Sequence, residues 1–180
     1  MKQLIINLFI ISTLAGCQNT SCPSFPEIIK DYMPYFKGEA INFVSSNNDT
    51  LHMIILDQWV TQPYKFKWNC KCSCEASMGF KTSLEADQLL KIKGEIIIYP
   101  EEKKSDLIIE FFNSQGNSDS FTIAVENIDP YLVNSTNLFG DTIKIEKEDS
   151  FRIENIKIIY GKGLIEFYDK IQNCNWVKIN

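Results

Sequence analysis

The 180-residue chain has a single histidine, His52, and no run of lysines or arginines. A metal site built from several histidines is therefore excluded, and histidine-based catalysis would depend on this one residue. Its strand-like surroundings predict a histidine that faces solvent or a hydrogen-bond partner, rather than a general base near Asp57. The formal charge of −5 argues against nucleic acid as a partner, and the one basic pair, Lys103-Lys104, follows Glu101-Glu102 and is interpreted as a solvated turn.

Signatures of catalysis and nucleotide binding are also missing. The chain has no Gly-x-Ser-x-Gly elbow, and Gly161-Lys162-Gly163 lacks the helix start of a phosphate-binding loop, which leaves a hairpin turn as its interpretation. No cofactor is predicted. Carboxylates are plentiful and include Asp57, Glu110, Glu166 and Asp169. Their spacing selects no pair, so a polymer hydrolase with a carboxylate pair is the alternative to a non-enzymatic binding module.

The apolar run 4–11 is too short to cross a membrane, which takes roughly 20 apolar residues. Because the run follows the positive start Met1-Lys2, it is typical of a signal peptide. It leads into Leu14-Ala15-Gly16-Cys17, which resembles the bacterial lipobox. The resemblance implies that diacylglycerol is attached to the Cys17 thiol and that residues 1–16 are removed by cleavage before it.

The remaining chain is then expected to be a lipoprotein, with residues 17–21 as a tether and 22–180 as one β-rich domain. Two or three acyl chains make the anchor stable, because each buried methylene contributes about 0.8 kcal/mol. Gln18 follows the lipidated cysteine, whereas an aspartate there would resemble an inner-membrane retention signal. Since the first acidic residue is Glu27, the periplasmic leaflet of the outer membrane is favoured over the cell surface.

Alternation of apolar and polar residues, which is typical of strands, runs through most of the domain. The clearest pairing is a hairpin over 106–126. A phase shift at Asn155 indicates a bulge, residues 26–31 indicate one helical turn, and the capping box 82–85 allows a second. Further strands are expected at 41–43, 51–55, 64–75, 95–99, 142–147, 151–160, 163–169 and 174–179. These elements predict an all-β antiparallel sandwich or a partly closed barrel, and the sequence leaves the choice open.

The segment 64–75 alternates aromatic residues and cysteines with polar residues, which predicts a strand with one buried face. That face carries a cysteine triplet, namely Cys70, Cys72 and Cys74. Neighbours at i and i+2 on a strand lie about 6.5–7 Å apart, at the limit for a disulfide. The triplet is therefore expected to find partners elsewhere in the chain.

Cys22 and Cys174 are the partners that remain when Cys17 carries lipid. In an oxidising envelope, each is expected to form a disulfide with a member of the triplet, which leaves one thiol over. The alternative is a soft-metal site in which the three triplet thiolates bind Zn²⁺ or Cu(I). A flat strand splays the sulfurs apart, and the usual Cys-x-x-Cys turn is absent, so the disulfides are preferred.

The segments 31–39, 42–51 and 161–169, together with Trp176, resemble the two ends of Bacteroidetes-type lipoproteins of unknown function. The resemblance brings no activity and no catalytic residue. In such bacteria, Asp-Ser/Thr followed by an apolar residue is an O-glycosylation pattern. The resemblance therefore implies modification at Thr50 and Thr142, which both lie beside expected turns.

The loops 113–119 and 128–140 are the candidate binding segments. The second loop is long, and long loops are often functional. It contains Tyr131, Leu132, Leu138 and Phe139. An exposed aromatic patch there would favour a protein or glycan as ligand. The expected partners are thus the membrane, through Cys17, and an unidentified protein or glycan.

Overall fold

The computed structural model describes residues 22–61, 74–83, 90–131 and 138–179. The predicted signal peptide, the predicted tether and Cys17 therefore lie outside the described residues. Within them, no helix has the length and apolarity needed to span a lipid bilayer. The elements are η1 (Glu27–Tyr32), β1 (Ala40–Ser45), β2 (Thr50–Thr61), β3 (Ala76–Thr82), β4 (Lys91–Tyr99), η2 (Pro100–Glu102), β5 (Lys104–Phe112), β6 (Ser118–Glu126), β7 (Thr142–Glu146), β8 (Ile153–Ile159), β9 (Gly163–Asp169) and β10 (Cys174–Ile179).

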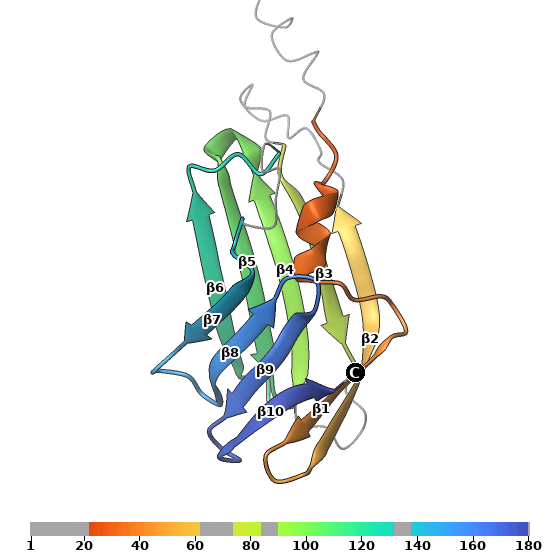
Figure 1. The fold of residues 1–180 in the computed structure, drawn as a ribbon, viewed down its shortest axis with the longest axis vertical. Coiled ribbons are helices and arrows are strands. Elements are labelled where there is room, and N and C mark those ends of the chain that lie inside the picture. Colours follow the sequence, from red (N-terminus) through yellow and green to blue (C-terminus); the bar gives the residue numbers. More distant parts are fainter. Residues whose placement is uncertain (1–21, 62–73, 84–89, 132–137, 180) are drawn as a thin grey trace, which may run out of the picture.

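The ten strands of the described part form one antiparallel sheet in the order β6-β5-β4-β3-β2-β1-β10-β9-β8-β7. The sheet curls on itself. Figure 1 shows β2 to β6 as one wall, with β1 and β10 to β7 in front of it. The two ends of the order, β6 and β7, come close together, so the sheet is nearly closed. The all-β prediction is confirmed, and the partly closed barrel is the form that the chain adopts.

The core lies between the two walls and is filled from alternate strand positions. In β4, for example, Ile92, Ile96 and Ile98 are at most 2% exposed. Burying a side chain of this size stabilises the fold by about 1.5–3 kcal/mol. The predicted hairpin 106–126 is confirmed as β5 and β6, and its Phe111 and Phe121 rings meet edge to face at 5.9 Å.

Glycines explain why the sequence understated two strands. β4 begins four residues before its predicted start at 95, and β3 was not predicted. Gly79 of β3 lies opposite Trp59, and a Cβ there would come within 2.4 Å of the indole. Gly94 of β4 lies opposite Phe80, whose ring would be 2.3 Å from a Cβ. Each glycine leaves space for an aromatic ring of the neighbouring strand, so it belongs to the strand although its β propensity is low.

Other local predictions fare differently. The helical turn near 26–31 is confirmed as η1, and the register of β8 against β9 shifts between Ile153 and Asn155, as the phase shift predicted. Gly161-Lys162-Gly163 is the β8–β9 turn, with Gly161 and Gly163 at positive φ. The strand over 64–75, apart from its last two residues, and a helix after the capping box lie outside the described residues.

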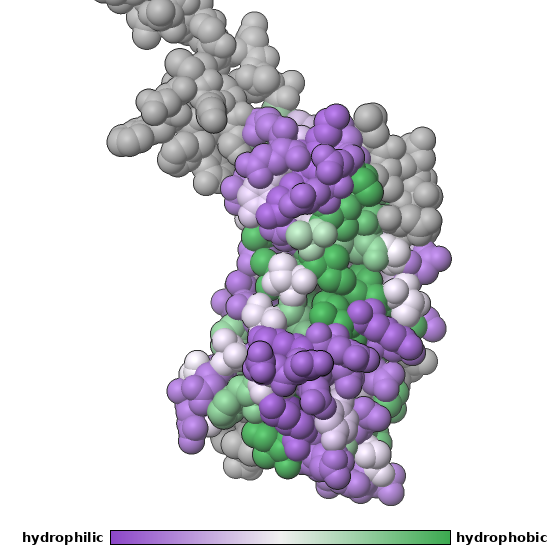
Figure 2. All heavy atoms as spheres, turned by 90° about the vertical axis from the view of Figure 1, so that its left-hand side faces the viewer, coloured by the Kyte–Doolittle hydropathy of each residue, from purple (hydrophilic) through white to green (hydrophobic). Residues whose placement is uncertain are grey.

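The seam where β6 meets β7 is bridged at one end by side chains. Asp119 of β6 is 2% exposed, and its carboxylate accepts hydrogen bonds from the backbone N–H groups of residues 151, 152 and 153 at 2.5–2.7 Å. Lys147 donates to the Ser120 carbonyl at 3.4 Å. Figure 2, viewed from this side, shows an apolar strip between hydrophilic regions. Ile123 and Ile145, on the two edge strands, are only partly buried.

Candidate functional site

The helix η1 is fastened to the β8–β9 hairpin along one side. The Tyr160 hydroxyl lies 2.9 Å from Asp31 Oδ2 and 3.1 Å from the Ile28 carbonyl, and the Gly161 N–H donates to the Asp31 carbonyl at 2.7 Å. Burial and the Asp31 carboxylate raise the pKa of Tyr160 to about 12. The phenol therefore keeps its proton across the physiological range and holds η1 in place.

The segment after η1 packs between the two walls of the sheet, against β3 and β9. Met33 and Tyr35 are at most 2% exposed, and the Tyr35 ring packs 4.3 Å from that of Phe80. The Tyr35 hydroxyl accepts the Leu164 N–H at 2.6 Å, and burial raises its pKa well above the ordinary value. Gly163 leaves room for this hydroxyl, because a Cβ there would lie 2.3 Å from it. These contacts hold the segment in a fixed position, and its residues form the floor of the groove described next.

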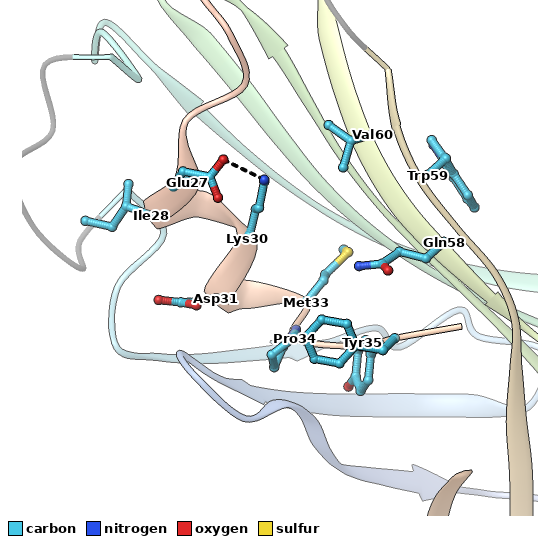
Figure 3. Close-up of a pocket in the computed structure, with 11 residues that line it drawn as sticks. Glu27, Ile28, Lys30, Asp31, Met33, Pro34, Tyr35, Gln58, Trp59 and Val60 are labelled. Carbon is cyan, nitrogen blue, oxygen red and sulfur yellow. Dashed lines mark hydrogen bonds and ion pairs between the residues drawn. The ribbon is translucent and has the colours of Figure 1, made fainter. Parts of the chain in front are cut away.

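A groove of about 720 Å³ opens between η1 and the second half of β2. Figure 3 shows Gln58 and Val60 pointing from β2 towards η1, whereas Trp59 points to the other side of the strand. Val60 is 36% exposed. The lining residues are Glu27, Ile28, Lys30, Asp31, Met33, Pro34, Tyr35, Phe36, Gln58, Trp59 and Val60. Its size and its mixture of apolar and polar groups suit a ligand-binding site.

The charges of the groove all lie on η1. The Lys30 ammonium is 2.7 Å from Glu27 Oε1, an ion pair within one helical turn, and Figure 3 shows this pair on the η1 side of the groove. Asp31 carries a second carboxylate, which accepts from Tyr160. The lining therefore has a formal charge of −1, so a cation or a neutral donor is the better electrostatic match for a ligand.

One of the two expected disulfides is present. Cys22 is bonded to Cys74 of the triplet, with their Cα atoms 5.4 Å apart. Cys22 precedes η1, and Cys74 lies just before β3, whose Ser77 pairs with Thr61 at the end of β2. The bridge therefore joins the segment before η1, which is one wall of the groove, to the segment before β3, the strand that pairs with the β2 wall.

The second expected disulfide is absent, because Cys174 is a buried free thiol. It begins β10, opposite Asp169, and burial raises its pKa. Cys70 and Cys72 lie outside the described residues. Since the Cys74 sulfur is bonded to Cys22, it is not a thiolate, and the soft-metal alternative loses one of its three ligands. Among the described residues, no group of three or more potential ligands is arranged to hold a metal ion.

The four carboxylates considered for catalysis do not converge. Each lies within 4 Å of a different cation. The pairs are Asp57 with Lys81 at 3.3 Å, Glu110 with Lys93 at 3.4 Å, Glu166 with Lys157 at 3.8 Å and buried Asp169 with Arg152 at 2.5 Å. His52 hydrogen-bonds the side chain of Asn42 on the neighbouring strand β1, as predicted for a strand histidine with a structural partner. These contacts are those of a folded scaffold.

In the parts of the two candidate loops that the structure describes, the side chains make contacts within the protein. Asn113 Oδ1 accepts the N–H groups of Gln115 and Asn117 at 2.9 Å, which closes the first loop into a tight turn. In the second, Leu138 is 5% exposed, and the Phe139 ring meets that of Tyr32 edge to face at 5.2 Å. Leu132 and its neighbours to 137 lie outside the described residues.

The predicted glycosylation sites are both accessible. Thr50 is exposed at the first residue of β2, and Thr142 is exposed at the first residue of β7. Each follows a turn or bend, where a transferase could reach the hydroxyl. Modification of these threonines stays a prediction.

Sequence reasoning missed the groove. Its prediction for β2 stopped at Ile55, whereas the strand runs to Thr61. The usable signal was the continuation Trp59-Val60-Thr61, which is rich in strand-forming residues. No local signal indicated that η1 would lie across from this part of β2, because their contact depends on the β8–β9 hairpin more than a hundred residues later.

The fold and groove define a nearly closed, barrel-like β sheet with a short helix opposite one of its strands. Comparison of the chain with protein-family models, curated proteins and solved structures finds no match. The function must therefore be argued from the chemistry of the groove.

Proposed function

We propose that this protein is a non-enzymatic, ligand-binding lipoprotein of the bacterial cell envelope, held by lipid on Cys17 to the outer membrane, on the periplasmic leaflet. The observation that carries the binding role is the η1–β2 groove of about 720 Å³. One of its walls is partly exposed and apolar, at Val60, and the other is charged. Such a combination supplies burial for affinity and polar groups for orientation.

The disulfide limits how far the domain can move from the lipid anchor. Cys22 follows Cys17 by five residues, a stretch that spans at most about 18 Å when fully extended. Because Cys22 is bonded to Cys74, the end of the barrel that carries the disulfide would stay within this distance of the lipid. The groove, whose η1 wall begins five residues after Cys22, would then be presented close to the membrane surface.

The pairing of the candidate carboxylates favours binding over hydrolysis. A glycosidase needs two carboxyl groups facing one bond, at about 5–5.5 or 6.5–9.5 Å from each other. Asp57, Glu110, Glu166 and Asp169 are each engaged with a different cation. Among the described side chains, these four give the hydrolase alternative no support.

Replacement of the lipidated residue tests the anchor. In native cells, Cys17→Ala should abolish incorporation of labelled palmitate and should move the protein from the membrane fraction to the soluble fraction. Intact mass spectrometry of the wild-type protein should find the lipid on Cys17. An unmodified Cys17 in membrane-derived protein would overturn the anchor.

A matched pair of variants tests the groove. The purified full-length lipoprotein in detergent micelles is screened against peptide, glycan and lipid libraries, together with Val60→Lys and Thr61→Lys. Val60 points into the groove, whereas the next residue of the strand faces the other way. We expect at least one ligand class that only Val60→Lys weakens. If every ligand found binds both variants equally well, or is consumed, the proposal is wrong.

A further inference from the structure

We infer that the ligand of the groove is an extended polypeptide that adds to β2 as an extra strand, with apolar residues at alternate positions and a basic residue facing η1. This inference rests on the proposed function, because it names the ligand class of the same groove. It depends on the backbone of β2 as well as on the lining side chains.

β2 is longer than its neighbour β1, so among the described residues half of β2 has a partner strand on one side only. The pairing of β1 with β2 ends at Ala40 and Ile54, and Ile55 completes it by bonding residues 38 and 39. Beyond a register shift, the residues from Asp57 to Thr61 pair with β3. In the described part of the chain, no strand pairs with their other side. An unpaired strand edge of this kind is a template for strand addition.

Three residues of this unpaired stretch, Gln58, Trp59 and Val60, line the groove. Gln58 and Val60 are two residues apart, so both point to the same face, and Figure 3 shows them directed towards η1 and Met33. A strand added beside β2 would run about 4.8 Å from it and would place every second side chain on this same face. These side chains would meet Val60 and the floor at Met33. An alternating apolar pattern in the ligand follows from this geometry.

The η1 wall adds a charge preference. Its Lys30 ammonium is already paired with Glu27, and Asp31 leaves the lining with a formal charge of −1. The Glu27 side chain is 83% exposed, so its carboxylate is within reach of an incoming cation. A lysine or arginine of the ligand on this side would be attracted, whereas an acidic residue would be repelled.

A glycan is the less favoured occupant. Sugar rings bind proteins largely by stacking on exposed aromatic faces. The Trp59 indole is turned to the opposite side of β2, over Gly79, and Tyr35 is 1% exposed. Phe36, 67% exposed, is the one exposed ring among the residues that line the groove. The free backbone edge, by contrast, offers hydrogen-bonding groups that a peptide main chain matches.

The test uses the full-length lipoprotein in detergent micelles and a phage library of short random peptides. We expect selected peptides to show alternating apolar residues and a lysine or arginine. Val60→Lys should weaken their binding about tenfold or more, because inward-pointing charges are what natural edge strands use to block strand addition. Thr61→Lys should change binding by less than about twofold, since this residue faces the opposite side of the strand. Circular dichroism of both variants shows whether they fold.

Backbone methylation of a selected peptide then separates strand addition from side-chain recognition. In an added strand, only alternate N–H groups face β2. N-methylation of one alternate set should abolish binding, and methylation of the other set should be tolerated. Equal tolerance of both sets would overturn strand addition.

The remaining outcomes distinguish the inference from the proposed function. A glycan or lipid that binds the groove and is weakened by Val60→Lys would overturn the peptide ligand and would leave the binding role intact. Self-association of the lipoprotein in sedimentation, lost in Val60→Lys, would place a second copy on the edge and would also overturn the peptide. If no peptide, glycan or lipid binding responds to Val60→Lys, both the inference and the proposed function fail.

Discussion

Within the described residues, strand pairing stops at the β6–β7 seam and along the second half of β2, and the two places differ. At the β6–β7 seam, the Asp119 carboxylate accepts three backbone N–H groups, and Lys147 donates to a β6 carbonyl. At the second half of β2, no side chain of the described residues bridges the free edge to η1. There the strand faces the groove instead.

At the seam closure is structural, whereas at the β2 edge we propose that a ligand supplies it. Buried N–H groups without partners are costly, so the seam needs the carboxylate that satisfies them. The β2 edge borders an open groove, where water can satisfy the backbone until a ligand arrives. One gap in the ladder is therefore part of the stability of the fold, and the other is the surface that we propose for binding.

The largest effect is expected at the seam. Asp119→Ala leaves three N–H groups without their acceptor, which should lower the free energy of unfolding by about 3–6 kcal/mol. Asp119→Asn keeps one acceptor oxygen and should lose less. Urea unfolding measures both, with the exposed Asp149→Ala of the adjacent turn as a control that changes the same charge. Equal stability of Asp119→Ala and the control would show that the seam is not held by this carboxylate.

The disulfide between the groove walls comes next. Cys22→Ser combined with Cys74→Ser removes a cross-link between residues 52 apart, which should lower the free energy of unfolding by up to about 4 kcal/mol through the unfolded chain. The wild-type protein in reductant should approach the stability of the variant. Thermal unfolding with and without reductant measures this. If reductant changes the wild-type melting temperature by less than about 2 °C, the bridge does not hold the walls.

A smaller effect is expected where η1 is fastened. Tyr160→Phe removes the hydroxyl that meets Asp31 and should cost about 1 kcal/mol. The folded pKa of Tyr160, about 12, lies above its ordinary value of 10.0, so its stabilising contribution is complete below pH 10 and is lost as the pH rises from 10 to 12. The melting temperature of the wild-type protein should therefore fall more steeply in this window than that of Tyr160→Phe. Parallel slopes would contradict the assignment.

The smallest effect on stability is expected at the open edge. Val60→Lys changes a side chain that is 36% exposed, so the free energy of unfolding should change by no more than about 0.5 kcal/mol, as for Thr61→Lys. Urea unfolding of the two variants checks this. A loss of several kcal/mol in Val60→Lys alone would mean that the groove is part of the core, and the comparison between the two gaps would then fail.

Much of the fold could be read from local patterns, because alternation directly records which strand face is buried. The β5–β6 hairpin and the bulge at Asn155 were predicted in this way. β3 was missed because Gly79 breaks the apolar pattern, and the reason for that glycine, the indole of Trp59, lies on another strand. The site was missed for a similar reason, since the position of η1 opposite β2 depends on Tyr160, which lies more than a hundred residues later.

The sequence by itself determined the all-β class, the helical turn before β1 and the supply of cysteines, because each follows from residue type and spacing along a short segment. Tertiary structure alone decided that Cys22 pairs with Cys74 and that Cys174 stays a thiol. It also decided which N–H groups, more than thirty residues away, donate to Asp119. These contacts depend on how the sheet curls, and curling brings together segments whose separation no local pattern encodes.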